Sequence, residues 1–173
     1  MLERFYPKEW LDSTYEIPWE DWRARGIRGV LFDIDNTLVE HDAPADERAV
    51  ALFARLHKLG IGTCLISNNR EPRVKAFAER VDSLYIYKAR KPGRKNYLRA
   101  MELLGTDRTS TLFVGDQLFT DVCGANACGI YSILVKPIDP REEIQIVLKR
   151  YLEAVVLHFY KRTLNSDRKE TNR

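Results

Sequence analysis

The chain has 173 residues, 45% of them hydrophobic, which is enough for one sizeable core and too few to expect two. Its formal charge of +3 is small, whereas a dedicated nucleic-acid-binding protein carries a concentrated basic face, so composition argues against that class. The three cysteines have no CxxC spacing and no neighbouring histidine cluster, which argues against a disulfide framework and against a zinc site.

Five short apolar runs, often β-branched, recur along the chain and predict strands. Their expected ranges are Val30–Asp35, Thr63–Ser67, Leu84–Tyr87, Leu112–Gly115 and Tyr131–Val135. No apolar run approaches the roughly 20 residues that a membrane-spanning helix needs. The N-terminus also lacks the basic and then apolar pattern of a signal peptide, so we expect a cytoplasmic protein.

Segments with helical spacing alternate with these runs. The predicted helices are Ala45–Leu59, Arg73–Val81, Lys95–Leu104, Asp121–Cys128 and a longer one from Arg141 to about Thr163. Three of them are followed by Gly60, Gly105 and Gly129, where a left-handed C-cap is favoured. The last helix is preceded by Asp139 and Pro140 and has Glu142 in its first turn, in the order of a capping box.

The alternation of buried strands and helices predicts a doubly wound α/β domain with a mainly parallel, five-stranded sheet covered on both faces. In such domains ligands bind beyond the carboxyl ends of the strands. The polar residues that directly follow each apolar run are therefore the candidates for a functional site.

Two carboxylates, Asp33 and Asp35, follow the first predicted strand. Side chains two residues apart on an extended backbone point to the same side, so both should face one site. One carboxylate could then attack a phosphorus atom, while the other donates a proton to the leaving oxygen and later accepts one from water.

The next two strands are followed by groups that suit phosphoryl oxygens. Ser67, Asn68 and Asn69 follow the second strand and offer a hydroxyl and two amides. Lys88 and Lys91 follow the third strand, and either lysine could neutralise a phosphoryl group.

Asp116 and Asp121 follow the fourth strand. Carboxylate oxygens are hard ligands that suit Mg²⁺, and Mg²⁺ removes the repulsion between a phosphate dianion and the attacking carboxylate. The acids of the first and fourth strands together therefore predict a magnesium site.

With these four motifs in order, residues 29–121 resemble the haloacid dehalogenase superfamily of phosphatases, which has a three-layer, Rossmann-like fold. The resemblance implies that Asp33 is the nucleophile and a Mg²⁺ ligand, and that Asp35 is the acid and base and offers its backbone carbonyl to the metal. It further implies that Asp116 binds Mg²⁺. Ser67, Asn68 and Lys91 would bind the phosphoryl group, and Asp121 would support Asp116 or Lys91.

From the length of the chain we expect residues 1–173 to form one domain. It would comprise an aromatic N-terminal strap (1–26), a catalytic core (27–138), a C-terminal helix (139–163) and a polar tail (164–173). Too few residues separate the motifs to hold a large cap domain, so the site should be open to bulky substrates.

The whole chain is similar to the YqeG-type subgroup and to the phosphatidylglycerophosphate phosphatases of bacteria and organelles. That similarity implies a lipid substrate and peripheral contact with the inner face of a membrane. A soluble sugar phosphate, a nucleotide or a nucleic-acid end is the alternative substrate. A non-enzymatic, phospho-accepting adaptor is a further alternative, but a receiver domain carries its aspartate after the third strand, where this chain has lysines. Oligomeric state is open.

Three other features of the sequence allow either a structural or a functional interpretation. Six cations without an acid lie between Lys88 and Arg99, and they form either a solvated face or an anion-binding surface. The aromatic residues of 1–26 favour a strap packed on the sheet over a membrane anchor. No role is assigned to the three histidines, of which His41 is the first.

The last predicted helix carries a wide apolar stripe. Its members are Ile144, Leu148, Tyr151, Leu152, Val155 and Phe159. Such stripes usually face a protein core, so we expect this one to be buried, with membrane contact as the minority alternative.

Overall fold

The computed structural model describes residues 2–139 and 151–163. Six strands form one sheet in the order β1-β6-β5-β2-β3-β4, and every neighbouring pair is parallel. The strands are β1 (Glu9–Leu11), β2 (Gly29–Phe32), β3 (Gly62–Ile66), β4 (Leu84–Ile86), β5 (Thr111–Gly115) and β6 (Tyr131–Val135).

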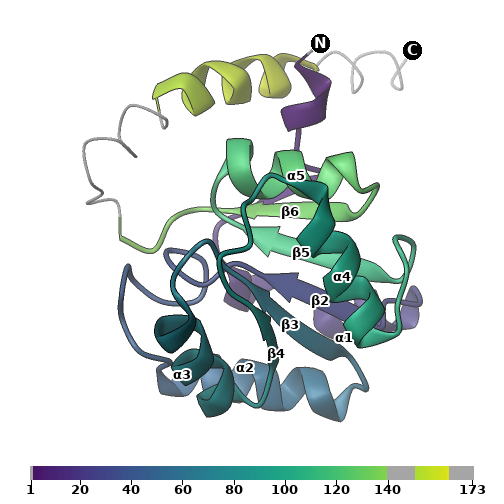
Figure 1. The fold of residues 1–173 in the computed structure, drawn as a ribbon. Coiled ribbons are helices and arrows are strands. Elements are labelled where there is room, and N and C mark those ends of the chain that lie inside the picture. Colours follow the sequence, from purple (N-terminus) through teal and green to yellow (C-terminus); the bar gives the residue numbers. More distant parts are fainter. Residues whose placement is uncertain (1, 140–150, 164–173) are drawn as a thin grey trace.

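Helices connect the strands and cover both faces of the sheet (Figure 1). They are α1 (Trp19–Ala24), α2 (Glu47–Lys58), α3 (Glu71–Val81), α4 (Arg94–Leu104) and α5 (Cys123–Ala127). Shorter turns are η1 (Glu3–Phe5), η2 (Thr14–Glu16) and the π-helical η3 (Leu118–Val122), and a further helix spans 151–163.

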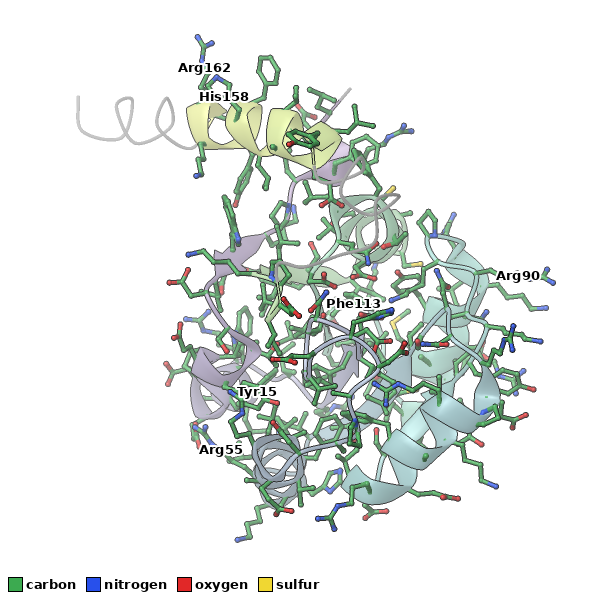
Figure 2. All side chains as sticks on the ribbon, turned by 90° about the vertical axis from the view of Figure 1, so that its left-hand side faces the viewer. Tyr15, Arg55, Arg90, Phe113, His158 and Arg162 are labelled. Atoms are coloured by element: carbon green, nitrogen blue, oxygen red, sulfur yellow. The ribbon has the colours of Figure 1, made fainter. Side chains whose placement is uncertain are left out.

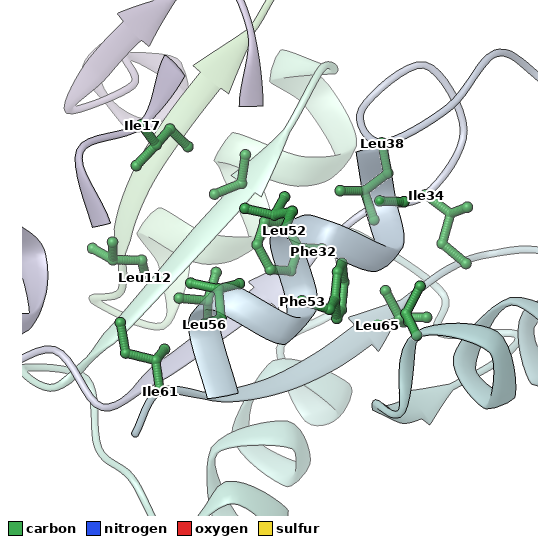
Figure 3. Packing of buried hydrophobic residues seen from close by; sticks show 14 of the residues in the cluster. Ile17, Phe32, Ile34, Leu38, Leu52, Phe53, Leu56, Ile61, Leu65 and Leu112 are labelled. Carbon is green, nitrogen blue, oxygen red and sulfur yellow. The ribbon is translucent and has the colours of Figure 1, made fainter. Parts of the chain in front are cut away.

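The core lies in two layers, one on each face of the sheet. On one face α1, α2 and α3 pack against β2, β3, β5 and β6, and on the other α4 and α5 pack against β2 to β5. Leu52, Phe53 and Leu56 of α2 recur at helical spacing and lie against the sheet (Figure 3). Each such side chain contributes about 1.5–3 kcal/mol when fully buried.

The predicted doubly wound α/β fold is confirmed, with one strand more than expected. All five predicted strands are present, although the first ends at Phe32 and leaves Asp33 just beyond it. The sixth strand, β1, comes from the segment predicted as a strap and extends the sheet beside β6. Its residues Glu9, Trp10 and Leu11 do not form an apolar, β-branched run, so the pattern that predicted the other strands does not extend to it.

The helix boundaries follow the predicted capping signals. Gly60, Gly105 and Gly129 all adopt positive φ, at 69°, 62° and 71°. The helix expected over residues 121–128 begins earlier, as η3, and continues as α5. Except for Asp139, the predicted capping box and the predicted polar tail lie outside the described residues.

No cap domain is inserted at either connection where one could stand. Residues 33–46 join β2 to α2, and residues 67–70 join β3 to α3, so neither connection holds a further domain over the carboxyl edge of the sheet. Within the described ranges, no helix combines the length and the apolarity needed to cross a bilayer.

The N-terminal aromatics pack inward. Trp19 and Trp22 are buried, while Phe5, Tyr6 and Trp10 are half-buried in a small cluster with η3 and the helix over 151–163. The N-terminal segment therefore forms an edge strand beside β6 and then packs α1, through Trp19 and Trp22, on one face of the sheet.

The apolar stripe of the last helix faces solvent, so its predicted burial is wrong for every member that the structure describes. Tyr151, Leu152, Val155 and Phe159 are exposed. The helix is seated by its other face, through Glu153, Val156 and Tyr160, because the neighbouring surface offers a backbone donor and an aromatic ring for the polar members of that face. Ile144 and Leu148 lie outside the described residues.

Candidate active site

The carboxyl ends of the central strands meet at a pocket of about 260 Å³. It collects the residues that follow β2, β3, β4 and β5, as the parallel topology requires. The lining residues are Asp33, Asp35, Asn36, His41, Ser67, Asn68, Asn69, Lys91, Gln117 and Thr120. His41 and Asn68 are exposed, so the pocket is accessible from solvent.

The end of β2 fixes the two carboxylates of the DxD motif. The Asp33 amide donates to the Val114 carbonyl at 3.0 Å, which continues the pairing of β2 with β5 for one residue. The chain then turns at Asn36, which adopts a φ of 61° and donates its amide to the Val39 carbonyl at 2.7 Å. As a result Asp33 and Asp35 line the same pocket, as predicted.

Lys91 is the lysine that enters the site. Its side chain is 4% exposed, and its Nζ donates to Asp33 Oδ1 and, at 2.7 Å, to Asp121 Oδ1. The Nζ lies 5.9 Å from the ring centroid of Phe113, near the middle of Figure 2. Lys88 is exposed and does not line the pocket, and Arg90 points away from the molecule in the same view.

Asn68 holds the backbone of Lys91. The Lys91 amide donates to Asn68 Oδ1 at 2.8 Å, and Asn68 Nδ2 donates to the Lys91 carbonyl at 3.4 Å. This pair of bonds ties the loop after β3 to the loop after β4. Asn68, which was predicted to bind phosphate, lines the pocket, and its side-chain amide also positions the backbone of Lys91.

Ser67 is buried at the floor of the site. Its Oγ accepts a hydrogen bond from the Asn69 amide at 3.1 Å, so the hydroxyl proton can still be donated into the pocket. This leaves Ser67 able to donate to an anionic oxygen beside Lys91.

Burial governs the electrostatics of the attacking position. Burial raises the pKa of Asp33 well above its ordinary value, and the neighbouring Asp121 and Asp116 raise it further, while Lys91 opposes them. Burial lowers the pKa of Lys91, but Asp121 and Asp33 outweigh that effect and raise it above the ordinary value. Lys91 is therefore a fixed cation between two buried acids.

Three buried acids stand close enough to share a cation. Carboxylate oxygens of Asp33, Asp116 and Asp121 lie within 4.8 Å of one another. Thr37 Oγ1 donates to Asp116 Oδ1 at 3.2 Å, and the Gln117 amide donates to Asp121 Oδ2 at 3.1 Å. An all-oxygen set held by such bonds suits a hard divalent ion such as Mg²⁺.

Asp35 is held by donors from three segments. Its Oδ1 accepts from the Asp42 amide at 2.9 Å and from Arg73 Nη2 at 3.0 Å, and its Oδ2 accepts from Asn69 Nδ2 at 3.3 Å. Its side chain is 17% exposed, so it can still meet a group in the pocket. Arg73 was not predicted for the site, because a single arginine on a helix carries no sequence signal.

His41 also lines the pocket, although no role was predicted for it. Its Nδ1 lies 3.9 Å from Asp35 Oδ1. Asn36, Gln117 and Thr120 are further lining residues that the motifs did not single out. All of them stand in or beside the same loops as the predicted residues, and proximity to the motifs is the one signal that could have found them.

The assembled groups suit covalent phosphoryl transfer. A buried carboxylate stands beside a fixed lysine, a second carboxylate faces the same cavity, and a group of acids can hold a metal ion. A nucleophile, a proton carrier and a cation for the phosphoryl charge are the parts that such a reaction needs.

Known phosphatases are similar to this chain in sequence. A family model described as HAD-hydrolase-like matches residues 88–137. The chain is 37% identical to "Probable phosphatase YqeG" of Bacillus subtilis, over 94% of this chain and 95% of that protein. It is 27% identical to the chloroplastic and mitochondrial phosphatidylglycerophosphate phosphatase 1 of Arabidopsis thaliana, over 82% of this chain but 44% of that protein.

Solved structures share the fold at low sequence identity. The cobalt-bound deoxy-D-mannose-octulosonate 8-phosphate phosphatase of Haemophilus influenzae superposes with a TM-score of 0.55 at 16% identity, covering 66% of this chain and 81% of its own. A subfamily III A hydrolase of Legionella pneumophila superposes with a TM-score of 0.53 at 17% identity, covering 68% and 69%.

Proposed function

Because this chain belongs to the phosphatases of the haloacid dehalogenase superfamily, we propose that it hydrolyses a phosphomonoester by way of a covalent aspartyl-phosphate on Asp33. The observation that carries the proposal is the position of the buried Asp33 carboxylate just after β2. It accepts a hydrogen bond from Lys91 and lines the same pocket as Ser67.

The proposed reaction has two steps. Asp33 attacks phosphorus, the bond from phosphorus to the leaving oxygen breaks, and Asp35 donates its proton to that oxygen. Asp35 then accepts a proton from water, whose oxygen attacks the phosphorus of the aspartyl-phosphate and releases inorganic phosphate and Asp33. Each step conserves charge and protons.

The surrounding groups would hold the phosphoryl oxygens during both steps. Lys91 supplies a fixed positive charge, and Ser67 supplies a hydroxyl donor. Asn68 would act through Lys91, whose backbone it holds on both sides. Asp121 would keep Lys91 charged and in place.

Mg²⁺ is the proposed cofactor. Asp33 and Asp116 would bind it with their carboxylates, Asp35 would add its backbone carbonyl, and the closeness of the acidic oxygens fits a small hard ion. When bound, the ion lowers the repulsion between the phosphate and the carboxylates.

Phosphatidylglycerophosphate is the favoured substrate, and it would be reached at a membrane surface. The likeness to a phosphatidylglycerophosphate phosphatase supports it, and so does a pocket that no cap domain closes. A soluble sugar phosphate, a nucleotide or a nucleic-acid end is the second candidate, favoured by the exposed cations Lys88 and Arg90 near the loop that carries Lys91.

The test is phosphate release from phosphatidylglycerophosphate in mixed micelles and from a panel of soluble monoesters, each with and without Mg²⁺. We expect Mg²⁺-dependent release and a preference for the lipid. Asp33→Asn is the control, since it removes the nucleophile at nearly constant volume, and it should fold but not turn over. A preference for a soluble ester would refute the proposed lipid substrate. Phosphate release by Asp33→Asn would refute the proposed mechanism.

A further inference from the structure

The helix over 151–163 presents two unlike faces. Its seated face carries Val156 against Leu118 and Leu134, and its Tyr160 ring lies 5.2 Å from the ring of Tyr6. The buried acid of this face, Glu153, accepts a hydrogen bond from the Leu118 amide at 2.9 Å. These contacts fix the rotation of the helix about its axis.

The opposite face is apolar and exposed. Tyr151, Leu152, Val155 and Phe159 expose 71%, 58%, 55% and 44% of their surfaces. Their spacing places them on one side of the helix. Single exposed apolar residues are ordinary, but four large ones on one face of one helix mark a surface that is covered by something else.

The charges beside this face identify the occupant. The exposed charged residues of the described helix are Lys161 and Arg162, and Arg162 points away from the body of the molecule in Figure 2. The one acid of the helix over 151–163 is Glu153, which is buried and accepts the hydrogen bond from the Leu118 amide. Lys161 places its Nζ 4.7 Å from the ring centroid of Trp10 on the seated side, so Arg162 is the charge beside the apolar face within the described helix. An apolar and aromatic face bordered by a cation matches an anionic bilayer surface. A second copy of this helix would bring more cations and no exposed acid to meet them.

We propose that the helix over 151–163 docks on an anionic lipid surface through Tyr151, Leu152, Val155 and Phe159. This rests on the proposed function, since a lipid substrate lies in such a surface.

The same helix is joined to the active site. Leu118, which donates to Glu153, begins η3, the turn that contains Asp121. Asp116 and Glu153 also line one small groove between the helix and the edge of the sheet. When the helix is docked, the segment after β5 therefore has a set position relative to the bilayer. The active-site pocket, which this segment helps to line, has a set position as well.

The first experiment measures binding without catalysis. Wild-type protein is sedimented with vesicles of equal parts phosphatidylglycerol and phosphatidylcholine, beside vesicles of phosphatidylcholine alone. The test variant is the double substitution Val155→Asp with Phe159→Asp. The control is Leu103→Asp, which changes a similarly exposed apolar residue of α4 on another part of the surface.

We expect wild type and Leu103→Asp to bind the anionic vesicles, and the double variant to bind at least about tenfold more weakly, because it places two charges in the interface. Equal binding by the double variant would overturn the proposal. So would a wild type that ignores anionic vesicles and sediments in solution as a dimer which the double substitution dissociates, because the face would then bind a second copy.

The second experiment separates this proposal from the proposed function. Hydrolysis of a soluble monoester by the double variant should equal that of wild type, since the substituted residues lie outside the pocket. Hydrolysis of phosphatidylglycerophosphate in anionic vesicles should fall with the binding. Wild type that binds vesicles but leaves that lipid intact would support the docking surface and refute the lipid substrate, whereas lipid hydrolysis unaffected by the double substitution would refute the docking surface.

Discussion

Replacing Lys91 with methionine tests the electrostatic design of the site. The substitution keeps most of the side-chain volume and removes a cation whose side chain is 4% exposed. It leaves the buried carboxylates of Asp33, Asp116 and Asp121 together with no lysine between them. Lys88→Met is the matched control, because Lys88 comes from the same loop but is exposed.

Breaking a buried ion pair from one side costs about 3–5 kcal/mol, because the remaining charge is left without its partner. For a chain of this size such a loss lowers Tm by roughly 6–20 °C. The loss of a fixed charge at the phosphoryl group should also reduce kcat by about 100-fold or more. Lys88→Met should change the free energy of unfolding by no more than about 0.5 kcal/mol and should keep its activity.

The assays are urea unfolding in metal-free buffer at pH 7 and phosphate release from a soluble monoester with Mg²⁺. If Lys91→Met unfolds like wild type and still turns over, the lysine neither braces the acids nor serves the phosphoryl group. If Lys88→Met is the inactive variant, the sequence alternative was the correct one and the assignment of Lys91 fails.

Three further predictions concern the same region of the sheet. In metal-free protein folding raises the pKa of Asp33, so the free energy of unfolding should fall as the pH rises above about 4, the ordinary pKa of an aspartate. Added Mg²⁺ should restore the lost stability. Unfolding measured against pH in wild type and in Asp33→Asn checks both expectations. Gly115→Ala would place a Cβ 2.7 Å from the Asp121 Cβ, so calorimetry should show a loss of about 1–3 kcal/mol, with reduced activity. Burial raises the pKa of the Cys64 thiol to about 12, so this cysteine should react with a thiol reagent at pH 8 only after unfolding.

Strand periodicity and turn residues predicted most of the fold, because both act locally. The apolar runs of β2, β3, β5 and β6 and the left-handed glycines are visible in any window of a few residues. The site residues that follow the strands could then be placed together by topology alone, since parallel strands end at one edge. The three-residue β1 was missed, because Glu9, Trp10 and Leu11 lack an apolar, β-branched run and only their pairing with β6 defines the strand.

The choice between Lys88 and Lys91 shows where local reasoning stops. Lys88 and Arg90 both adopt positive φ, at 44° and 53°, so the loop after β4 does not alternate like a strand. Asn68 then holds the backbone of Lys91 from a neighbouring loop. Which lysine reaches Asp33 depends on these two conditions together, and neither is visible in the residues 88–91 by themselves.

The last helix shows a different limit. Periodicity identified an apolar stripe, and the usual inference from such a stripe is burial, because water is the alternative environment. Burial of one face also depends on what the neighbouring surface offers. Here that surface offers the Leu118 amide to Glu153 and an aromatic ring to Tyr160, so a mixed face is seated and the more apolar face is left outside. An apolar stripe therefore marks a contact surface without identifying the partner, and the described residues of this protein do not cover the apolar face of the last helix.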